Sequence, residues 1–171
     1  MMTTPRRTIL ILFVIFACIG CDQASKSLAQ RELPGSPPVT LLGRTIHFQY
    51  TENTGALLGV GSSLSPIVRF WLLIVFAGAA LTAILAFTIV DKKLRKSDIF
   101  ALSIVLGGGL GNLTDRLLKG GIVVDFMRIS IGPVETAIFN LADVMITFGL
   151  VFLLLSNIPW FNRPPQNPDN G

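Results

Sequence analysis

Long apolar runs separated by short polar segments dominate the chain. A helix that crosses a bilayer needs about 20 apolar residues, and four runs are long enough. The expected spans cover about residues 8–28, 69–90, 98–117 and 137–157. Between the first two, from about 35 to 60, prolines and glycines break any helix and short runs predict strands. The Pro- and Asn-rich tail from about 162 to 171 is predicted to be disordered.

The composition agrees with this pattern. Hydrophobic residues make up 51% of the 171 residues and charged residues 14%, whereas a soluble domain has roughly 25% charged residues. The sequence therefore predicts one α-helical integral membrane domain, residues 1–171, with four transmembrane helices and a small β-rich cradle outside the bilayer. The net charge is +4, and the basic residues lie beside apolar runs. This placement favours membrane lipids rather than nucleic acid as partners.

The two cysteines, Cys18 and Cys21, lie in the first apolar run, which follows Arg6 and Arg7. A basic segment before an apolar run is also typical of a cleaved secretory signal, and a cysteine at its end is typical of a lipoprotein signal. We interpret the run as a retained first span, because the rest of the chain lacks the composition of a soluble secreted domain. One CxxC pair supplies only half the ligands of a structural zinc site, so no metal is expected.

Polar side chains near the apolar runs are the candidates for chemistry, because an ionisable group at membrane depth costs about 3 kcal/mol. Asp143 lies within the fourth run, and Asp125 follows the third. Four alternating spans bring the end of the first, the start of the second, the end of the third and the start of the fourth to one membrane face. The candidates gathered there are Asp22, Lys26, Asn53, Asn112, Asp115, Arg116, Asp125, Asn140 and Asp143.

The orientation in the membrane follows from the distribution of Lys and Arg, which favour the cytoplasmic side. The 14 basic residues divide equally between the two sides. Four of them, however, crowd into the short loop after the second span: Lys92, Lys93, Arg95 and Lys96. We therefore predict that both termini are cytoplasmic and that the polar candidates lie at the outer face.

Five separate motifs, taken together, resemble the bacterial lipoprotein signal peptidase (signal peptidase II) family. They are Asp22-Gln-Ala-Ser-Lys26, Asn53-Thr-Gly-Ala56, Gly108-Gly-Leu-Gly-Asn-Leu-Thr-Asp-Arg116, Val123-Val-Asp-Phe126 and Phe139-Asn-Leu-Ala-Asp143. The resemblance extends over nearly the whole chain, in the family's order. One departure is Leu57-Leu58, where the family usually has alanine and an aromatic residue, and it concerns the loop over the site.

This resemblance implies an aspartic endopeptidase that removes the signal peptide of diacylglyceryl-modified prolipoproteins, cutting before the lipidated cysteine. Asp125 and Asp143 would form the catalytic dyad. The residues that would support the dyad or bind substrate are Asn53, Gly55, Asn112, Arg116 and Asn140. The residues that would hold the helices together are Asp22, Lys26 and Asp115.

The resemblance also implies a location and partners. The protein would be a multi-pass protein of the bacterial inner membrane, with the cradle and the active site facing the periplasm. Globomycin-type cyclic peptides would inhibit it. It would need no metal and no organic cofactor.

Other interpretations of the same residues remain open. A proton- or cation-coupled membrane transporter would also carry acids within its spans, although here no polar track reaches the other face. A structural membrane anchor would use them only as contacts between helices, and Asp115 and Arg116 could form an ion pair at the membrane boundary.

For a peptidase, two close carboxylates cannot both ionise easily, so one is expected to keep a proton while the other takes a proton from water.

Overall fold

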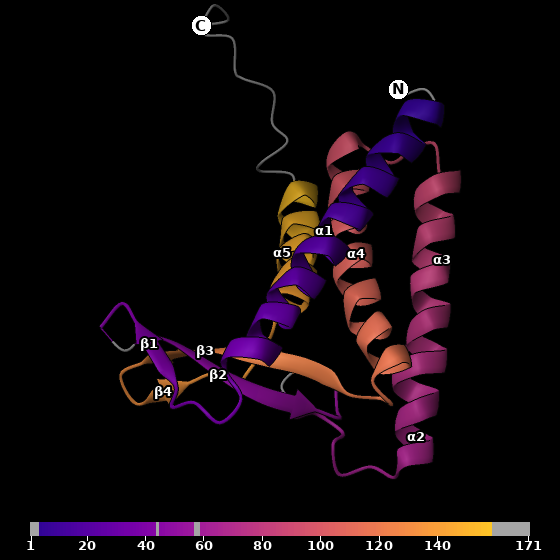
Figure 1. Cartoon of the computed structure of the whole chain (residues 1–171). Coiled ribbons are helices and arrows are strands. Elements are labelled where there is room, and N and C mark those ends of the chain that lie inside the picture. Colours follow the sequence, from indigo (N-terminus) through magenta and orange to yellow (C-terminus); the bar gives the residue numbers. More distant parts are fainter. Residues whose placement is uncertain (1–3, 44, 57–58, 159–171) are drawn as a thin grey trace, which may run out of the picture.

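The computed structural model describes residues 4–43, 45–56 and 59–158. The expected tail at 162–171 and the unusual Leu57-Leu58 pair lie outside these described residues. The elements in chain order are α1 (Thr4–Glu32), β1 (Val39–Leu41), β2 (Ile46–Asn53), α2 (Pro66–Phe70), η2 (Trp71–Phe76), α3 (Ala77–Val90), α4 (Lys96–Leu118), β3 (Val123–Ile131), β4 (Val134–Glu135) and α5 (Leu141–Asn157). The helices form a bundle, and a small sheet lies across one end of it (Figure 1).

The helices have the length and surface of membrane spans. Within the described residues, three stretches are long and apolar enough to cross a membrane: Pro5–Glu32, Pro66–Val90 and Lys96–Leu118. The second joins α2, the π-helical η2 and α3 without a break. Large apolar side chains point outward, such as Phe13 (71% exposed) and Leu154 (69%). Apolar surface of this extent is typical of membrane contact, so the chain is an α-helical membrane protein, as predicted.

The first and last helices differ in extent from the expected spans. α1 runs beyond 8–28 at both ends. The fourth span was expected from about residue 137, but α5 begins at Leu141, with Asn140 as its N-cap, and has 17 residues. The Asn140 side chain accepts a hydrogen bond from the backbone of Asp143, and the Asp143 side chain accepts one from the backbone of Asn140. This capping box fixes the start of α5. Phe139, which comes just before it, lies outside the helix and pairs with Met127 of β3.

The β-rich cradle contains more of the chain than the sequence predicted. In the described part, the sheet has four antiparallel strands in the order β1-β2-β3-β4. β1 and β2 come from the expected segment 35–60, whereas β3 and β4 follow α4 and were not predicted. The first residues of β3, Val123 to Phe126, are all buried. A strand buried on both faces lacks the alternation of apolar and polar residues that identifies a half-exposed strand.

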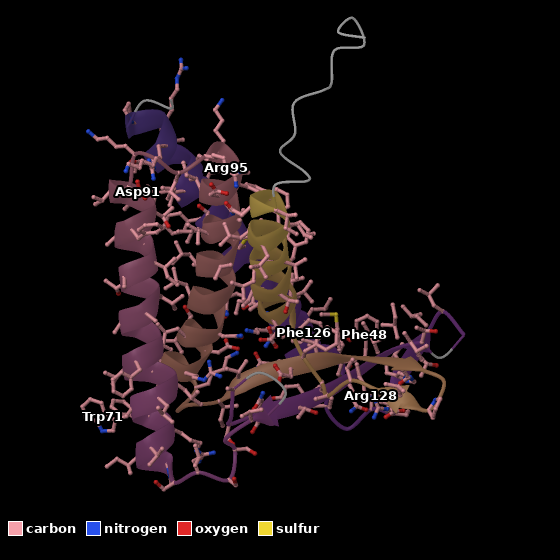
Figure 2. The ribbon with its side chains drawn as sticks, turned by 180° about the vertical axis from the view of Figure 1, so that it is seen from behind. Phe48, Trp71, Asp91, Arg95, Phe126 and Arg128 are labelled. Atoms are coloured by element: carbon pink, nitrogen blue, oxygen red, sulfur yellow. The ribbon has the colours of Figure 1, made fainter. Side chains whose placement is uncertain are left out.

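α4 is the central helix of the bundle, and it packs against α1, α3 and α5. Glycine permits this close approach, since a Cβ added at Gly108 would lie 2.6 Å from the carbonyl oxygen of Ala142 in α5. At the end of the bundle away from the sheet, Arg7 of α1 donates to the carbonyl oxygens of Thr88 and Asp91. Figure 2 shows Asp91 at this end and Arg128 on the sheet at the opposite end.

Candidate active site

The predicted polar residues lie where the bundle meets the sheet. Asp125 is the third residue of β3, and Asp143 is in the first turn of α5. One carboxyl group is thus carried by a strand and the other by a helix. Both residues are buried, with 2% exposure for Asp125 and 8% for Asp143. Hydrogen bonds and ion pairs connect these two residues with the other predicted ones, which are Asp22, Lys26, Asn53, Gly55, Asn112, Asp115, Arg116 and Asn140.

Asn140 joins the two aspartates. Its Nδ2 donates to Oδ1 of Asp125 at 2.6 Å, and its backbone N–H donates to Oδ2 of Asp143 at 3.2 Å. The helix cap fixes the direction of the amide, because Oδ1 of Asn140 accepts from the backbone N–H of Asp143 at 3.0 Å. The NH2 group is then left to face Asp125. One residue thus holds a carboxyl group from a strand and a carboxyl group from a helix in one site.

Each carboxyl group also accepts from a second asparagine. Nδ2 of Asn53 donates to Oδ2 of Asp125 at 2.8 Å, and Nδ2 of Asn112 donates to Oδ1 of Asp143 at 2.9 Å. Asn53 ends β2, and its own Oδ1 accepts from the backbone N–H of Gly55 at 2.8 Å. Hydrogen bonds from N–H groups favour the charged form of a carboxyl group. Both aspartates therefore have partners that suit an ionised state.

Burial works in the opposite direction at Asp125. Desolvation of the charged form, together with the nearby charge of Asp143, raises the pKa of the Asp125 carboxyl to about 6. The hydrogen bonds from Asn53 and Asn140 limit this rise. Two adjacent buried carboxyl groups favour a state in which one is ionised and the other keeps its proton. Such a pair can both accept and donate a proton near neutral pH.

A buried ion cluster, consisting of Asp22, Lys26 and Asp115, adjoins the dyad. Nζ of Lys26 lies 2.7 Å from Oδ2 of Asp22 and 3.1 Å from Oδ2 of Asp115, and all three side chains have 0% exposure. The carboxylates of the cluster also accept from backbone N–H groups, Asp22 from Ala142 of α5 and Asp115 from Val124 of β3. The cluster therefore ties α1 and α4 to the two elements that carry the dyad.

Arg116 does not pair with Asp115, a possibility that the sequence left open. Its Nη2 donates to the carbonyl oxygen of Gly55 at 2.7 Å, while Asp115 pairs with Lys119 at 2.9 Å. Gly55 is required at this point, since an added Cβ would lie 2.7 Å from the carbonyl oxygen of Gly59. Arg116 thus holds the turn after β2 next to α4.

Two hollows each reach one carboxyl group of the dyad. A cleft of about 250 Å³ reaches Asp125 and is lined by Thr51, Glu52, Asn53, Thr54, Gly59, Ser62, Asp125, Ala137 and Ile138. A groove of about 470 Å³ on α5 reaches Asp143 and is lined by Thr136, Phe139, Asp143, Val144, Thr147, Phe148 and Val151. Most residues that line the cleft beside Asp125 are polar, whereas most residues that line the groove on α5 are apolar.

The acids of the site do not form a metal-binding set. Among the described residues, no three His, Cys, Asp or Glu side chains are grouped so that they could hold a metal ion. Asp22 and Asp115 bind Lys26 instead.

The sequence did not reveal two further residues of the site. Nε2 of Gln23 donates to Oδ2 of Asp22 and to Oδ1 of Asp115, both at 3.2 Å. A Cβ at Gly111 would lie 2.6 Å from Oδ2 of Asp22, so this glycine makes room for the ion cluster. Gln23 and Gly111 each adjoin a predicted residue and lie within two of the quoted motifs, and these are the signals that could have identified them.

The sequence profile of the family described as Signal peptidase (SPase) II matches residues 14–158. The chain belongs to the signal peptidase II family. The matched segment includes every residue of the site, from Asp22 to Asp143. The two interpretations of the chain as a transporter or as a structural anchor receive no support from this match.

Several curated relatives carry the name lipoprotein signal peptidase. The one from Leifsonia xyli subsp. xyli is 36% identical over 168 residues, which are 90% of this chain and 72% of the relative. The one from Chlorobium phaeobacteroides is 33% identical over 158 residues, 85% of this chain and 91% of the relative. The one from Streptomyces griseus subsp. griseus is 32% identical over 155 residues, 88% and 74% of the two chains.

Solved structures show the same architecture. A bacterial membrane enzyme matches this chain with a TM-score of 0.74 and 24% identity, over 95% of this chain and 94% of that chain. A second bacterial membrane enzyme matches with a TM-score of 0.70 and 26% identity, over 89% and 92% of the two chains. The helical bundle with a sheet across one end is therefore a fold that bacterial membrane enzymes have.

Proposed function

We propose that this member of the signal peptidase II family cuts diacylglyceryl-modified prolipoproteins just before the lipidated cysteine, with Asp125 and Asp143 as its catalytic dyad. Removal of signal peptides from prolipoproteins by an aspartic-type peptidase is the activity of its family. One observation supports the choice of residues more than any other. The Asn140 side chain and backbone hold two buried carboxyl groups, one from β3 and one from α5, in a single hydrogen-bonded unit.

The dyad supplies both proton transfers of peptide hydrolysis. Asp143, ionised, takes a proton from water as the water oxygen attacks the scissile carbonyl carbon, and Asp125 gives its proton to the carbonyl oxygen. When the tetrahedral intermediate collapses, the C–N bond breaks. Asp143 then gives its proton to the leaving amine, and Asp125 regains one from the hydroxyl group. The pKa of Asp125, raised to about 6 by burial, suits the group that begins with the proton.

The two hollows suit the two parts of such a substrate. The groove on α5 is lined mainly by apolar side chains, including Phe139, Phe148 and Val151, and it lies on a helix with lipid-facing surface. Acyl chains could enter it without leaving the hydrocarbon. The cleft beside Asp125 has Thr51, Glu52 and other polar residues on its walls, which suit a peptide. Membrane lipids and globomycin-type cyclic peptides would occupy the same two hollows.

We place both termini in the cytoplasm, α5 as a fourth crossing, and the site at the periplasmic face of the inner membrane. The basic loop residues Lys92 and Lys93 follow α3 at the end away from the sheet, where Asp91 and Arg95 lie in Figure 2. Basic residues favour the cytoplasmic side. α5 has 17 residues and is thus about 25 Å long at the helical rise per residue, close to the thickness of the hydrocarbon core of a bilayer.

The cleavage itself is the experiment that tests the proposal. The purified protein is incubated with a diacylglyceryl-modified prolipoprotein and with the same precursor lacking the lipid, and the products are measured by mass spectrometry. We expect one new product that begins at the lipidated cysteine, and no product from the unmodified precursor. Equal cutting of both precursors, or a product that begins elsewhere, would contradict the proposed substrate.

The pH dependence should report the shared proton. Because the pKa of Asp125 in the free enzyme is raised to about 6, the group loses its proton as the pH rises through this value. We therefore expect kcat/KM to fall on the alkaline side of about pH 6. On the acidic side it should fall again, as the pair of carboxyl groups takes up a second proton. In kcat the alkaline limb should lie at higher pH, since the bound peptide in the cleft excludes water from Asp125. A kcat/KM that stays constant through this range would contradict the dyad.

The same assay separates the dyad from a metal site built on the same acids. We expect activity to survive a strong chelator, because the two carboxyl groups accept hydrogen bonds from Asn53, Asn112 and Asn140 and need no ion to act. The control is the same chelator saturated with calcium. Activity that is lost with the free chelator and restored by one particular divalent ion would show metal chemistry.

Labelling of single cysteines tests the orientation. In a variant with Cys18→Ala and Cys21→Ala, a cysteine that replaces Pro37 should react with a membrane-impermeant thiol reagent in intact cells. A cysteine that replaces Lys93 should react only after the membrane is opened. The two positions lie at opposite ends of the bundle, near β1 and after α3 respectively. The reverse labelling pattern would place the site on the cytoplasmic face.

A further inference from the structure

Three asparagines direct their NH2 groups at the dyad, and a donor holds the oxygen of each amide. For Asn53 the donor is the backbone N–H of Gly55, and for Asn140 it is the backbone N–H of Asp143. Asn112 differs, because Nζ of Lys26 donates to its Oδ1 at 2.9 Å. An ammonium group has only donors to offer. The direction of the Asn112 amide therefore depends on a side chain of another helix.

We infer that Lys26 is a positioning residue of the reaction, which acts by fixing Asn112 with its NH2 group toward Asp143. Oδ1 of Asn112 accepts from Lys26 and also from Nδ2 of Asn140, at 3.1 Å. Nδ2 of Asn112 then donates to Oδ1 of Asp143 at 2.9 Å. In the reversed amide, NH2 would face two donors and the oxygen would face a carboxylate. This inference rests on the proposed role of Asp143 in activating water.

The surroundings of Lys26 leave its ammonium group no other arrangement. The residue has 0% exposure, and its Nζ contacts Asp22, Asn112 and Asp115. These three acceptors match the three N–H bonds of the ammonium group. The contact with Asp22 lies within α1 and the contact with Asp115 joins α1 to α4, whereas the contact with Asn112 leads to the dyad. A purely structural ion pair would not need this third contact.

Loss of the donor from Lys26 should affect catalysis rather than binding. Only the donor from Asn140 then holds Oδ1 of Asn112, so the amide is directed less firmly and its N–H donation to the ionised form of Asp143 weakens. The two hollows do not include Lys26 or Asn112, so the substrate contacts stay in place. Asp143 is the one ionisable residue of α5. The remaining charged or titratable groups around Lys26, Asn112 and Asp143 are Asp22, Tyr50, Asp115, Arg116, Lys119 and Asp125.

The decisive variant removes the ammonium group without leaving a buried carboxylate unpaired. In the pair Asp22→Asn with Lys26→Met, one charge of each sign is lost. We expect kcat to fall on the order of 100-fold with KM changed by less than about twofold, and the acidic limb of the pH profile to move to higher pH. Asp22→Asn alone keeps Lys26 and is the reference, so the effect of Lys26 is the further change seen in the double variant. A folded double variant with the parent kcat and the parent acidic limb would overturn the inference.

Arg7→Met is the matched control. It also removes a buried cation of α1, but Arg7 bonds the carbonyl oxygens of Thr88 and Asp91 at the far end of the bundle. We expect Arg7→Met to lower the melting temperature and to leave kcat and the pH profile unchanged. If Arg7→Met moved the acidic limb as much as the variant without Lys26, the shift would reflect loosened packing, and the inference would fail.

A second variant tests the same link when the change at Lys26 prevents folding. Asn112→Asp keeps an oxygen for Lys26 and Asn140, but it replaces the NH2 group that faces Asp143 with an oxygen. We expect the same 100-fold order of loss in kcat and a melting temperature near that of the parent. Parent-like turnover in Asn112→Asp would overturn the inference. Turnover by Asp143→Asn would instead contradict the proposed dyad, so the two failures can be told apart.

Discussion

Asp125→Asn and Asp143→Asn are each expected to lower turnover of a lipidated prolipoprotein by about 10³-fold or more. Asparagine has nearly the shape of aspartate but can neither give up nor take a proton at neutral pH. Asp125→Asn removes the proton donor, and Asp143→Asn removes the group that activates water. The measurement is the initial rate of product formation by mass spectrometry, with each variant purified from membranes in the same detergent.

The loss should occur without unfolding. Since burial raises the pKa of Asp125 to about 6, its ionisation above this pH opposes folding, and a neutral asparagine at this position should not lower the melting temperature at pH 7. Asp91→Asn is the control, because Asp91 lies at the end of the bundle away from the sheet (Figure 2). We expect it to keep parent activity. Near-normal turnover by either dyad variant would exclude that residue from catalysis.

The sequence predicted the gathering of the polar residues because that result depends on topology more than on side-chain detail. Alternating apolar runs force the segment around Lys26, the end of α4 and the start of α5 to the same side of a bilayer. Asp143 and Asp125 could then be recognised as carboxyl groups in apolar surroundings. The structure brings these residues into one hydrogen-bonded network, through Asn112 and Asn140.

The details that the sequence did not provide all depend on contacts between distant segments. β3 was not predicted because Val123, Val124 and Phe126 are buried together with Asp125, so no alternation marks the strand. The start of α5 was placed too early, since Asn140 looks like any polar residue of a helix until its cap is seen. The role of Gly111 beside the ion cluster was not predicted, because its neighbour Asp22 comes from α1.

The network also explains why so many polar groups are tolerated within an apolar protein. A buried ion pair contributes little to stability when its desolvation is set against its attraction. The cluster around Lys26 nevertheless satisfies each of its members, because Asp22 and Asp115 also accept from the backbone of Ala142 and Val124. The backbone contacts belong to the elements that carry the dyad. The position of the two proposed catalytic groups is thus set by helix packing on one side and by the sheet on the other.

Asn140 should separate the geometry of the dyad from the stability of α5. In Asn140→Asp, a carboxylate oxygen can still accept from the backbone N–H of Asp143, so the cap remains. The NH2 group that donates to Asp125 at 2.6 Å is replaced by an oxygen, which repels that carboxyl group. We expect turnover to fall about 10²-fold to 10³-fold, as when a transition-state hydrogen-bond donor is removed, with the melting temperature close to that of the parent.

Asn140→Ala removes the cap as well as the donor. We expect a similar loss of turnover together with a loss of about 1 kcal/mol in the free energy of unfolding, the usual contribution of an N-cap side chain. Asn157→Asp, at the other end of the same helix, is the control and should leave turnover unchanged. Of the Asn140 variants, Asn140→Asp decides whether the donor to Asp125 is needed, because it keeps the helix cap. If that variant kept parent turnover, the donor to Asp125 would be unnecessary, and the two carboxyl groups would have to be held together by the fold alone.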